Sequence, residues 1–403
     1  MMMTKNLTRE GAIWVIDYSK FINSKVESIK PSGIRKFFDI ANEMEDVISL
    51  SVGEPDFLTP WHIRETAIST LEKGRTRYTP NRGFIDLRTE ISRFISRKYN
   101  VDYDPEKEIL VSVGGSEAID LCIRTIVSTG DEVLIPQPSF VCYVPIVEMS
   151  GGTPVIINTK AEDQFKLMPK DLEASITDKT KLLVLPFPNN PTGAVMRKNE
   201  LLEIAAIVEK HDLMVLSDEI YSELTYGDEA HTAFSSLPGM RERCILINGL
   251  SKSHSMTGWR MGYAAGPHEI IDLMTKLHQY AIMSAPTVSQ FAAIEALKNG
   301  DEDVEKMRKQ YDMRRRFIVD ALNKMGLTCF EPLGAFYVFP SVKSTGLTSM
   351  EFSEKLIYSK QVAVVPGDAF GDCGEGFLRI SYSYSIKHIT EALERIKAFL
   401  DEL

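Results

Sequence analysis

A lysine, a hydroxyl and an arginine stand close together in the stretch 249–262. Ser251 and Lys252 are neighbours, and Arg260 follows in the same segment. A lysine amine can attack a carbonyl as a nucleophile, and an arginine with a serine can hold a phosphate. Because most lysines and arginines lie on solvated surfaces, this group indicates a site only if other reactive or ligand-binding residues join it.

A glycine-rich turn offers a second group for a phosphate. The segment 114–117, Gly-Gly-Ser-Glu, follows the apolar run 109–113 and precedes a predicted helix. The free amides of Gly115 and Ser116 could bind an anion at the helix N-terminus. A tight turn between a strand and a helix explains the glycines equally well, so this segment alone decides nothing.

Two further segments place polar side chains after apolar runs. In 188–193, Pro-Asn-Asn-Pro-Thr-Gly, prolines set turns that carry two amides and a hydroxyl, and we favour a ligand-binding role for them. Asp218 follows the run 213–216 and would be partly desolvated there, where a carboxylate needs a cationic partner. A helix N-cap is the structural alternative for Asp218.

Taken together, these groups match the needs of one cofactor. A phosphate cradle, a carboxylate for a protonated pyridine nitrogen and a lysine for an aldehyde describe pyridoxal phosphate. Lys252 would form an imine with the aldehyde, and Tyr221 could hydrogen-bond the ring hydroxyl. The combination predicts a pyridoxal phosphate site around Lys252 and Asp218.

A sheet must position these groups at the ends of its strands. Short apolar runs alternate with amphipathic helices such as 116–128 and 199–210, which is typical of a mostly parallel sheet sandwiched by helices. Open sheets of this kind bind ligands beyond the carboxyl ends of their strands. The predicted fold class is therefore α/β, with strands at 109–113, 132–135, 154–157, 182–185, 213–216 and 245–247.

The pattern changes towards both ends of the chain. We predict an N-terminal segment, a large cofactor-binding domain and a small α+β domain that the N-terminal segment partly joins. Their expected limits are 1–60, 61–300 and 301–403. Near the first limit, Thr59 is expected to cap a helix that has Pro60 at its first position and closes at Gly74.

The composition argues against several other classes of protein. The chain has 403 residues, 44% of them hydrophobic, and a formal net charge of −10, so we expect no binding of nucleic acid or anionic membranes. The five cysteines are scattered and lack the spacing of a disulfide framework or a zinc site, so we expect no metal. The apolar run 13–16 is too short for a signal peptide or a membrane span. We therefore expect a cytoplasmic protein.

The stretch 249–262 resembles the signature of class I and II aminotransferases around their pyridoxal phosphate lysine. The Asn-Pro-Thr-Gly turn, the pair Asp218 and Tyr221, and the late Arg379 follow in the order of that family. The resemblance spans about residues 25 to 400. The chain is most similar to the bacterial group that includes aspartate, aromatic and N-acetyl-diaminopimelate aminotransferases. This implies the fold type I architecture of aspartate aminotransferase.

The resemblance also implies how the cofactor ring is held. Lys252 would be the Schiff-base lysine and the proton shuttle, and Asp218 would hold the pyridinium nitrogen. Tyr221 and Asn190 would hydrogen-bond the phenolic oxygen. Phe140 corresponds to the aromatic residue that stacks on the ring in this family.

The phosphate and the substrate have implied ligands as well. Arg379 would clamp the substrate α-carboxylate, with help from Asn190 and the Gly53 amide, because a guanidinium suits a planar carboxylate. Tyr78 corresponds to a tyrosine that reaches the phosphate from the other subunit, so we expect a homodimer with shared active sites. The remaining phosphate ligands would be Gly115, Ser116, Ser251 and Arg260.

The implied reaction is a ping-pong transamination between an L-amino acid and a 2-oxo acid. Glutamate and 2-oxoglutarate are expected for one half-reaction, and aspartate, aromatic or N-acetyl-diaminopimelate-type substrates stay open for the other. Ser116 stands where some aspartate-using relatives have a lysine for the distal carboxylate, which argues against a simple aspartate enzyme. The residues considered for the side-chain pocket are Tyr18, Phe21, Ile29, Ile34, Tyr280 and Ser284.

Three alternatives share parts of this pattern. A carbon–sulfur β-lyase would keep the same lysine, aspartate and arginine. A regulatory protein that binds pyridoxal phosphate would need a DNA-binding module before residue 30, where we find neither room nor basic charge. A nucleotide-linked dehydrogenase would need the motif G-x-G-x-x-G, which 114–117 lacks.

His254 invites a general-base role, but Lys252 already fills it, so we expect His254 to be structural.

Overall fold

The computed structural model describes residues 7–8, 11–12, 16–29, 33 and 44–403. The chain divides into an N-terminal unit, 1–31, and a main unit, 32–403. The N-terminal unit contains two paired strands, a short 3-10 helix and a single-turn α-helix. These elements are β1 (Leu7–Thr8), β2 (Gly11–Ala12), η1 (Ser19–Phe21) and α1 (Ser24–Glu27).

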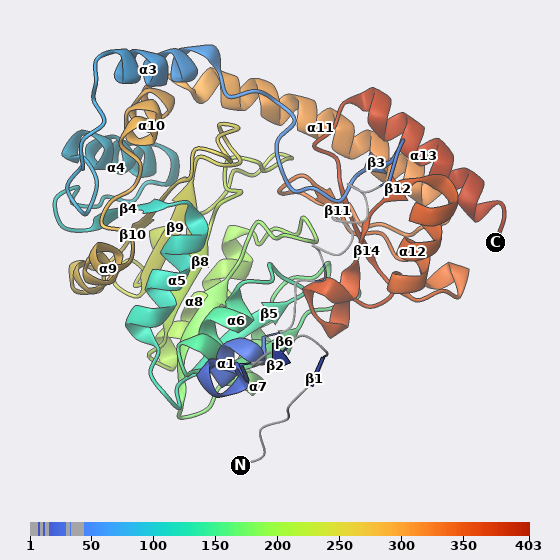
Figure 1. The fold of residues 1–403 in the computed structure, drawn as a ribbon, viewed down its shortest axis with the longest axis horizontal. Helices are drawn as coiled ribbons and strands as arrows, with labels where there is room; N and C mark the ends of the chain where they lie inside the picture. The colour runs from blue at the N-terminus through green and yellow to red at the C-terminus, as the bar shows by residue number, and fades with distance from the viewer. Residues whose placement is uncertain (1–6, 9–10, 13–15, 30–32, 34–43) are drawn as a thin grey trace. The chain divides into compact units, whose positions relative to one another are not determined.

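A seven-stranded sheet dominates the main unit, in the order β4-β10-β9-β8-β7-β5-β6 (Figure 1). All neighbouring strands are parallel, except that β10 is antiparallel to β4 and to β9. The α/β fold class predicted from the sequence is confirmed, and β10 is a strand that the apolar pattern does not indicate. The strands are β4 (Ile109–Val113), β5 (Glu132–Gln137), β6 (Thr153–Asn158), β7 (Thr180–Leu185), β8 (Met214–Asp218), β9 (Cys244–Gly249) and β10 (Met261–Ala265).

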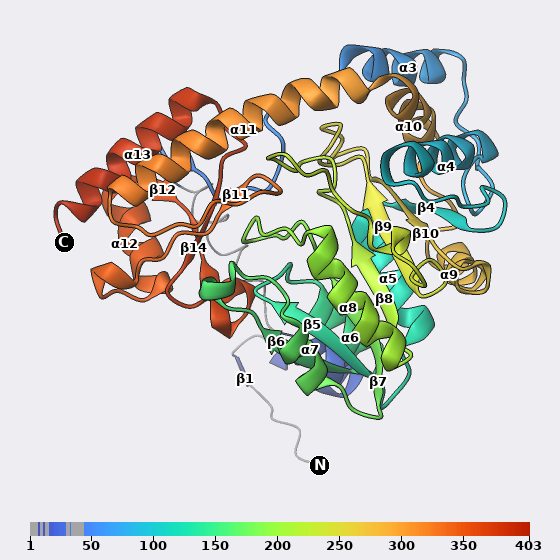
Figure 2. The same ribbon diagram turned by 180° about the vertical axis from the view of Figure 1, so that it is seen from behind.

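Both faces of the central part of this sheet are buried. In β7, Leu183 belongs to the core covered by α8 (Lys198–Lys210), whereas Leu182 belongs to the core covered by α5 (Gly115–Ile126). Figure 2, seen from behind, brings α8 to the front of the sheet, while α5 is in front in Figure 1. Strands buried on both faces consist of continuous apolar residues, which is why the sequence predicts them well.

A third core lies at the β4 and β10 end of the sheet, where three helices pack together. These are α3 (Trp61–Glu72), α4 (Ile85–Tyr99) and α10 (Thr287–Asn299). The remaining helices of this part are α6 (Tyr143–Met149), η2 (Ala161–Asp163), α7 (Pro169–Ser175), η3 (Phe234–Ser236) and α9 (His268–Ala281).

The predicted cap of the first of these helices is wrong. Helix α3 begins at Trp61, and Pro60 occupies the capping position without a side-chain hydrogen bond. The Thr59 hydroxyl instead donates to the Ser255 carbonyl at 2.6 Å and accepts from the Trp259 indole at 3.0 Å. Thr59 therefore joins the chain before α3 to the loop that carries Lys252. The predicted end at Gly74, which has a φ of 65°, is confirmed.

The C-terminal region follows a long helix, α11 (Asp301–Lys324), which runs from α3 and α10 towards it (Figure 1). It holds a three-stranded sheet, β11-β14-β13, and a parallel pair, β12-β3. Since β3 precedes the large sheet in the chain, residues before 60 contribute a strand here. The predicted domain limits at 60 and 300 stay predictions. The elements are β3 (Ile48–Ser49), β11 (Tyr337–Val338), η4 (Lys343–Thr345), α12 (Ser349–Lys360), β12 (Val362–Ala363), β13 (Val365–Pro366), η5 (Gly367–Phe370), η6 (Asp372–Gly374), β14 (Leu378–Ser381) and α13 (Ile386–Leu400).

No helix within the described ranges combines the length and the apolar character needed to cross a membrane. The five cysteines are all free thiols.

Candidate active site

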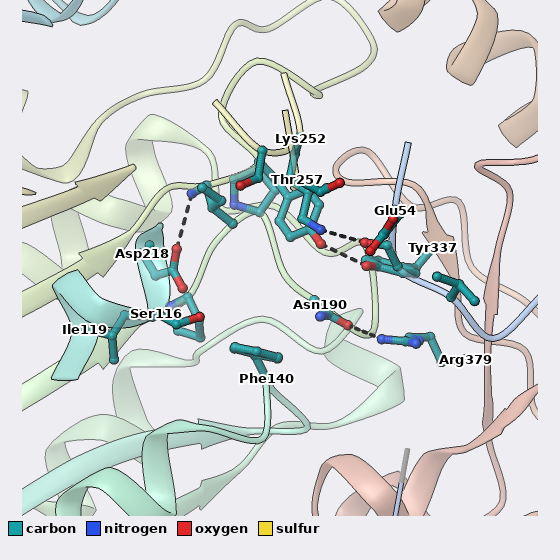
Figure 3. A pocket seen from close by; sticks show the side chains of 18 of the residues that line it. Glu54, Ser116, Ile119, Phe140, Asn190, Asp218, Lys252, Thr257, Tyr337 and Arg379 are labelled. Carbon is teal, nitrogen blue, oxygen red and sulfur yellow. Dashed lines mark hydrogen bonds between the residues drawn. The ribbon is translucent and has the colours of Figure 1, made fainter. Parts of the chain in front are cut away.

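A pocket of about 600 Å³ lies between the carboxyl ends of the large sheet and the C-terminal region (Figure 3). Its walls come from the turns after β4, β5, β7, β8 and β9, from β11 and β14, and from the segment 51–54. The predicted site residues that line it are Gly53, Gly115, Ser116, Phe140, Asn190, Asp218, Tyr221, Ser251, Lys252, Arg260 and Arg379. Residues from seven segments of the chain therefore meet at the sheet edge where the sequence predicts a site.

Lys252 lies in the loop between β9 and β10, and its Nζ donates to the Gly53 carbonyl at 2.6 Å. Burial lowers the pKa of Lys252 to about 8, the Glu54 carboxylate opposes this change, and Arg379 and Arg260 add to it. An amine with a pKa near 8 has an appreciable neutral fraction at neutral pH. Lys252 can therefore act as a nucleophile and as a base.

Two glycines allow the Lys252 loop to approach the turn after β4. Gly262 in β10 pairs with Gly249 in β9, and a side chain at 262 would collide with the backbone of Gly114. Gly114, with a φ of 78°, itself packs against the guanidinium of Arg260. Arg260 is thereby placed beside the N-terminus of α5, which begins at Gly115. A cation and a helix N-terminus together suit an anion such as a phosphate.

Asp218 ends β8 and is buried, with both carboxylate oxygens engaged. The Tyr143 hydroxyl donates to Oδ2 at 2.6 Å, and the Ile220 amide donates to Oδ1 at 3.2 Å. Burial raises the pKa of Asp218, while the two hydrogen bonds act against this change. A turn follows Asp218 rather than a helix, so the N-cap alternative is wrong. The arrangement suits a carboxylate that waits for a cationic partner.

The two asparagines of the turn after β7 have different surroundings. Asn189 is buried, and its Oδ1 accepts hydrogen bonds from the Thr192 amide at 3.1 Å and from the Thr192 hydroxyl at 2.8 Å. Asn190 faces the pocket, and its Oδ1 accepts from Arg379 Nη1 at 3.0 Å. Asn189 therefore stabilises the turn, and Asn190 is the one that can reach a ligand.

Arg379 in β14 is a buried cation, with only 3% of its surface exposed. Its Nη2 donates to the Ser51 carbonyl, and its Nε has no hydrogen-bond partner among the described residues. Its guanidinium carbon lies 4.7 Å from the centroid of the Tyr337 ring and 4.9 Å from that of Phe370. Burial lowers the pKa of Arg379, yet a guanidinium stays charged in proteins. Such a group can stabilise an incoming carboxylate strongly.

The close-up view places the ionic groups at two ends of the pocket. In Figure 3, Asp218 and Ser116 lie on the left, Arg379 and Tyr337 lie on the right, and Phe140 lies between them. A flat ring held against Phe140 would thus have a carboxylate at one end and a guanidinium at the other.

Glu54, Tyr143 and Tyr337 are among the lining residues that the sequence prediction does not name. Glu54 directly follows Gly53, which the resemblance already names, so that residue could have led to it. Tyr143 and Tyr337 lie in apolar stretches that resemble ordinary core segments. The Tyr337 hydroxyl lies 2.8 Å from the Tyr221 hydroxyl, a contact that no local pattern indicates.

Other predicted residues do not line this pocket. Tyr78 and Tyr280 are both 84% exposed, and neither they nor Ser284 form part of its wall. Ile34 is outside the described residues, and Tyr18, Phe21 and Ile29 belong to the N-terminal unit. The roles suggested for these residues stay predictions.

His254 is buried away from the pocket, as expected of a structural residue. Its Nδ1 lies 2.8 Å from the Ser253 hydroxyl, and burial lowers the pKa of His254 to about 4. The imidazole is therefore neutral at neutral pH.

Known proteins are similar to this chain in sequence and in fold. The profile of the family described as "Aminotransferase class I and II" matches residues 45–396. The putative aminotransferase YugH of Bacillus subtilis (strain 168) is 53% identical over 382 residues, which cover 95% of this chain and 99% of that protein. The aspartate aminotransferase of Pyrococcus abyssi is 46% identical over 94% of this chain and 98% of its own length.

Solved structures agree with these relatives. The crystal structure of an aromatic aminotransferase from Pyrococcus horikoshii OT3 matches with a TM-score of 0.87 and 46% sequence identity. The match covers 91% of this chain and 99% of that one.

Proposed function

The chain belongs to the class I and II aminotransferase family, and we propose that it uses pyridoxal phosphate to move an amino group between an L-amino acid and a 2-oxo acid. The observation that carries the proposal is the pocket itself. It joins Lys252, whose pKa is lowered to about 8, to the buried Asp218 and the buried Arg379. These groups can respectively attack a carbonyl, hold a cationic nitrogen and bind a carboxylate.

The residues of the pocket fit the proposed cofactor. Arg260 and the start of α5 form an anion site in which Gly114 leaves room for the guanidinium. Asp218 is a buried carboxylate without an ion pair to any described residue, so a pyridinium nitrogen would complete it. Phe140 lies between the two ends, where it could stack on a ring (Figure 3). We assign the phosphate to Gly115, Ser116, Ser251 and Arg260.

Pyridoxal phosphate, when bound, supplies an aldehyde for an amine and a ring that takes up the electron pair left by a departing proton. The chain supplies the remaining groups. Asp218 would keep the ring nitrogen protonated, because an ionised carboxylate favours the charged form of its partner. Tyr221 and Asn190 would hydrogen-bond the ring oxygen. The Tyr143 hydroxyl would orient Asp218 for this task.

Lys252 would act first as the covalent ligand of the cofactor and then as a base. With a pKa of about 8, its free amine could accept the α-proton of the amino acid near neutral pH. Its hydrogen bond to the Gly53 carbonyl gives the freed amine a resting position beside the substrate end. The same amine can return the proton to complete the transfer.

Arg379 would bind the α-carboxylate of the substrate. Its Nη1 and Nη2 are held by Asn190 and by the Ser51 carbonyl, which fixes the plane of the guanidinium. The amide of Gly53 lies in the same wall and could donate to the carboxylate. A fixed, desolvated guanidinium lowers the cost of orienting the substrate.

The charges of the pocket bear on the choice of substrate. Lys252, Arg260 and Arg379 are the cations among its described lining residues, and each has a role already. A second carboxylate on the substrate would therefore need a cation from outside these lining residues. We propose glutamate and 2-oxoglutarate for one half-reaction and leave aspartate, aromatic and N-acetyl-diaminopimelate-type substrates as candidates for the other.

A homodimer in the cytoplasm is part of the proposal. Tyr78 is 84% exposed on this chain, so its side chain is free to reach a phosphate in a second copy. The exposed apolar side chains Leu58, Trp61 and Tyr280 could be covered by the same contact.

A substrate panel tests the proposed function. Glutamate with a second 2-oxo acid should yield 2-oxoglutarate, with the parallel double-reciprocal plots of a ping-pong mechanism. A β-lyase would instead release pyruvate from cystathionine. If the protein formed pyruvate from cystathionine and transferred no amino group to any 2-oxo acid tried, the result would contradict the proposal and favour the β-lyase.

A further inference from the structure

Tyr337 contacts Tyr221, which would bind the cofactor, and Arg379, which would bind the substrate. Its hydroxyl lies 2.8 Å from the Tyr221 hydroxyl, and its ring lies under the Arg379 guanidinium at 4.7 Å. Figure 3 shows Tyr337 at the substrate end, beside Arg379. One side chain from β11 therefore links the residue that would hold the ring oxygen to the residue that would hold the α-carboxylate.

The position of the Tyr337 hydroxyl is tightly constrained. A side chain at Gly53 would collide with it, so the segment that carries the Lys252 acceptor packs directly on this hydroxyl. The rings of Tyr221 and Tyr337 meet edge to face, with centroids 5.9 Å apart and an interplanar angle of 77°. Phe336 packs on both rings, at 5.5 Å from Tyr221 and 4.9 Å from Tyr337. The tyrosine pair is thus held by packing as well as by its hydrogen bond.

The direction of that hydrogen bond follows from the number of protons. Burial raises the pKa of Tyr221 well above its ordinary value and also raises the pKa of Tyr337, so both hydroxyls stay protonated. Each hydroxyl has a single proton to donate. If Tyr221 donates to the ring oxygen, it must accept from Tyr337. Hydrogen bonds in such a chain polarise one another, so Tyr337 makes Tyr221 a stronger donor.

The charge of Arg379 acts on the same chain. A cation over the face of an aromatic ring withdraws electron density from it, which makes the Tyr337 hydroxyl a stronger donor. A carboxylate bound to Arg379 offsets that charge. The Tyr337 hydroxyl then becomes a weaker hydrogen-bond donor to Tyr221. Tyr221 in turn becomes a weaker donor to the ring oxygen.

We propose that Tyr337 is a positioning residue that transmits the binding of a carboxylate at Arg379 to Tyr221, and through Tyr221 to the oxygen that Tyr221 holds. This inference rests on the proposed function.

The test uses the absorbance of the intact protein with pyridoxal phosphate bound at Lys252. The absorption band changes with pH when the imine nitrogen between Lys252 and the cofactor loses its proton, so the pH of this transition reports how tightly that proton is held. Tyr337→Phe keeps the ring under Arg379 and removes the hydroxyl. Tyr221 then donates a weaker hydrogen bond to the ring oxygen, which keeps more negative charge. The imine nitrogen at Lys252 therefore holds its proton more tightly, and the pH of the absorbance transition should rise by roughly half a pH unit to one pH unit.

Two controls separate this role from a merely structural one. In a Tyr221→Phe background, adding Tyr337→Phe should cause no further shift, because the effect passes through the Tyr221 hydroxyl. Tyr382→Phe removes a similar buried hydroxyl from the same core, bonded to the Ala335 carbonyl at 3.0 Å, and should leave the transition in place. The melting temperatures of the cofactor-free variants report on folding alone.

Propionate, which has a carboxylate but no amine, tests the transmission. It should raise the transition pH of the unaltered protein and should raise that of Tyr337→Phe by clearly less. An unmoved transition in Tyr337→Phe, an equal shift in both backgrounds or an equal response to propionate would overturn the inference. A protein that never forms the band would overturn the proposed function as well, so the two failures are distinguishable.

Discussion

Asp218 and Arg379 lie at opposite ends of one pocket, and the chain holds them in different ways. Asp218 is held by Tyr143, the first residue of α6, and by the Ile220 amide in the turn after β8, and both segments follow strands of one sheet. Arg379 is held by Asn190 and by the Ser51 carbonyl, which come from the large sheet and from the segment after β3. One end is thus part of a single scaffold, and the other is assembled from separate parts of the chain.

The difference suggests a division of labour. The cofactor end needs fixed geometry and charge, which the sheet edge supplies. The substrate end combines the large sheet with β14 of the C-terminal region, and its guanidinium provides binding rather than chemistry. Substitutions at the cofactor end should therefore lower the rate of the chemical steps, and substitutions at the substrate end should mainly weaken substrate binding.

Lys252→Ala should have the largest effect, because Lys252 serves both ends. Loss of the nucleophile and base should lower kcat by about 10⁴-fold or more. Steady-state transamination with glutamate measures this loss. The melting temperature of the cofactor-free protein should change little, because among the described residues the amine hydrogen-bonds only to the Gly53 carbonyl. If the pure variant still transaminated readily, Lys252 would not be the catalytic residue that serves both ends of the pocket.

Asp218→Asn tests the cofactor end alone. The amide keeps the shape of the side chain but loses its charge, so proton removal from the substrate should slow by about 100- to 1,000-fold. Exchange of the α-proton of glutamate with solvent measures that step. Glu219→Gln is the matched control, since Glu219 is a buried carboxylate next in the chain that bonds to His231 instead. Equal losses in both variants would show a general effect of charge removal.

Arg379→Lys tests the substrate end alone. A lysine cannot reproduce the forked pair of N–H donors, so KM for the amino acid should rise by about 10- to 100-fold with a smaller change in kcat. Initial rates over a range of glutamate concentrations separate the two constants. Arg315→Lys is the control, because Arg315 is buried but pairs with Asp312 and Glu331 outside the pocket. A loss confined to kcat would contradict the proposed division.

The pH dependence of Lys252 gives the smallest expected effect and reports on both ends. Only the neutral amine can attack an aldehyde. Because the pKa of Lys252 is lowered to about 8, half of the protein molecules have a neutral Lys252 amine near pH 8. Capture of pyridoxal phosphate by the cofactor-free protein should therefore speed up about tenfold per pH unit below 8 and level off above it. Stopped-flow absorbance measures the rate. A rate that keeps rising to pH 10 would show an ordinary, solvated lysine.

Much of this arrangement could be predicted from the sequence because burial leaves a strong pattern. The central strands β7, β8 and β9 are almost entirely buried, and their sequences contain continuous apolar runs. The residues that follow those runs meet at one edge by the geometry of a parallel sheet. That is why Asp218, Asn190 and Lys252 could be placed near one another.

The missed features depend on contacts between distant segments. Strand β10 includes Gly262 and two alanines and follows the Lys252 loop, so its sequence lacks a run of large apolar residues. Thr59 has the side chain of a capping residue, but its hydroxyl takes part in tertiary hydrogen bonds. Tyr143 and Tyr337 lie in apolar stretches, and only the folded chain brings their hydroxyls to Asp218 and Tyr221. Sequence patterns report burial, not the partner of a buried hydroxyl.

The most direct test of the central claim is to find the covalent partner of the cofactor. The protein incubated with pyridoxal phosphate can be reduced with borohydride, digested and examined by mass spectrometry. The proposed function predicts a phosphopyridoxyl group on the peptide that contains Lys252, and its loss in Lys252→Ala. A label spread over surface lysines, or fixed at a different lysine while Lys252 stays unmodified, would contradict it.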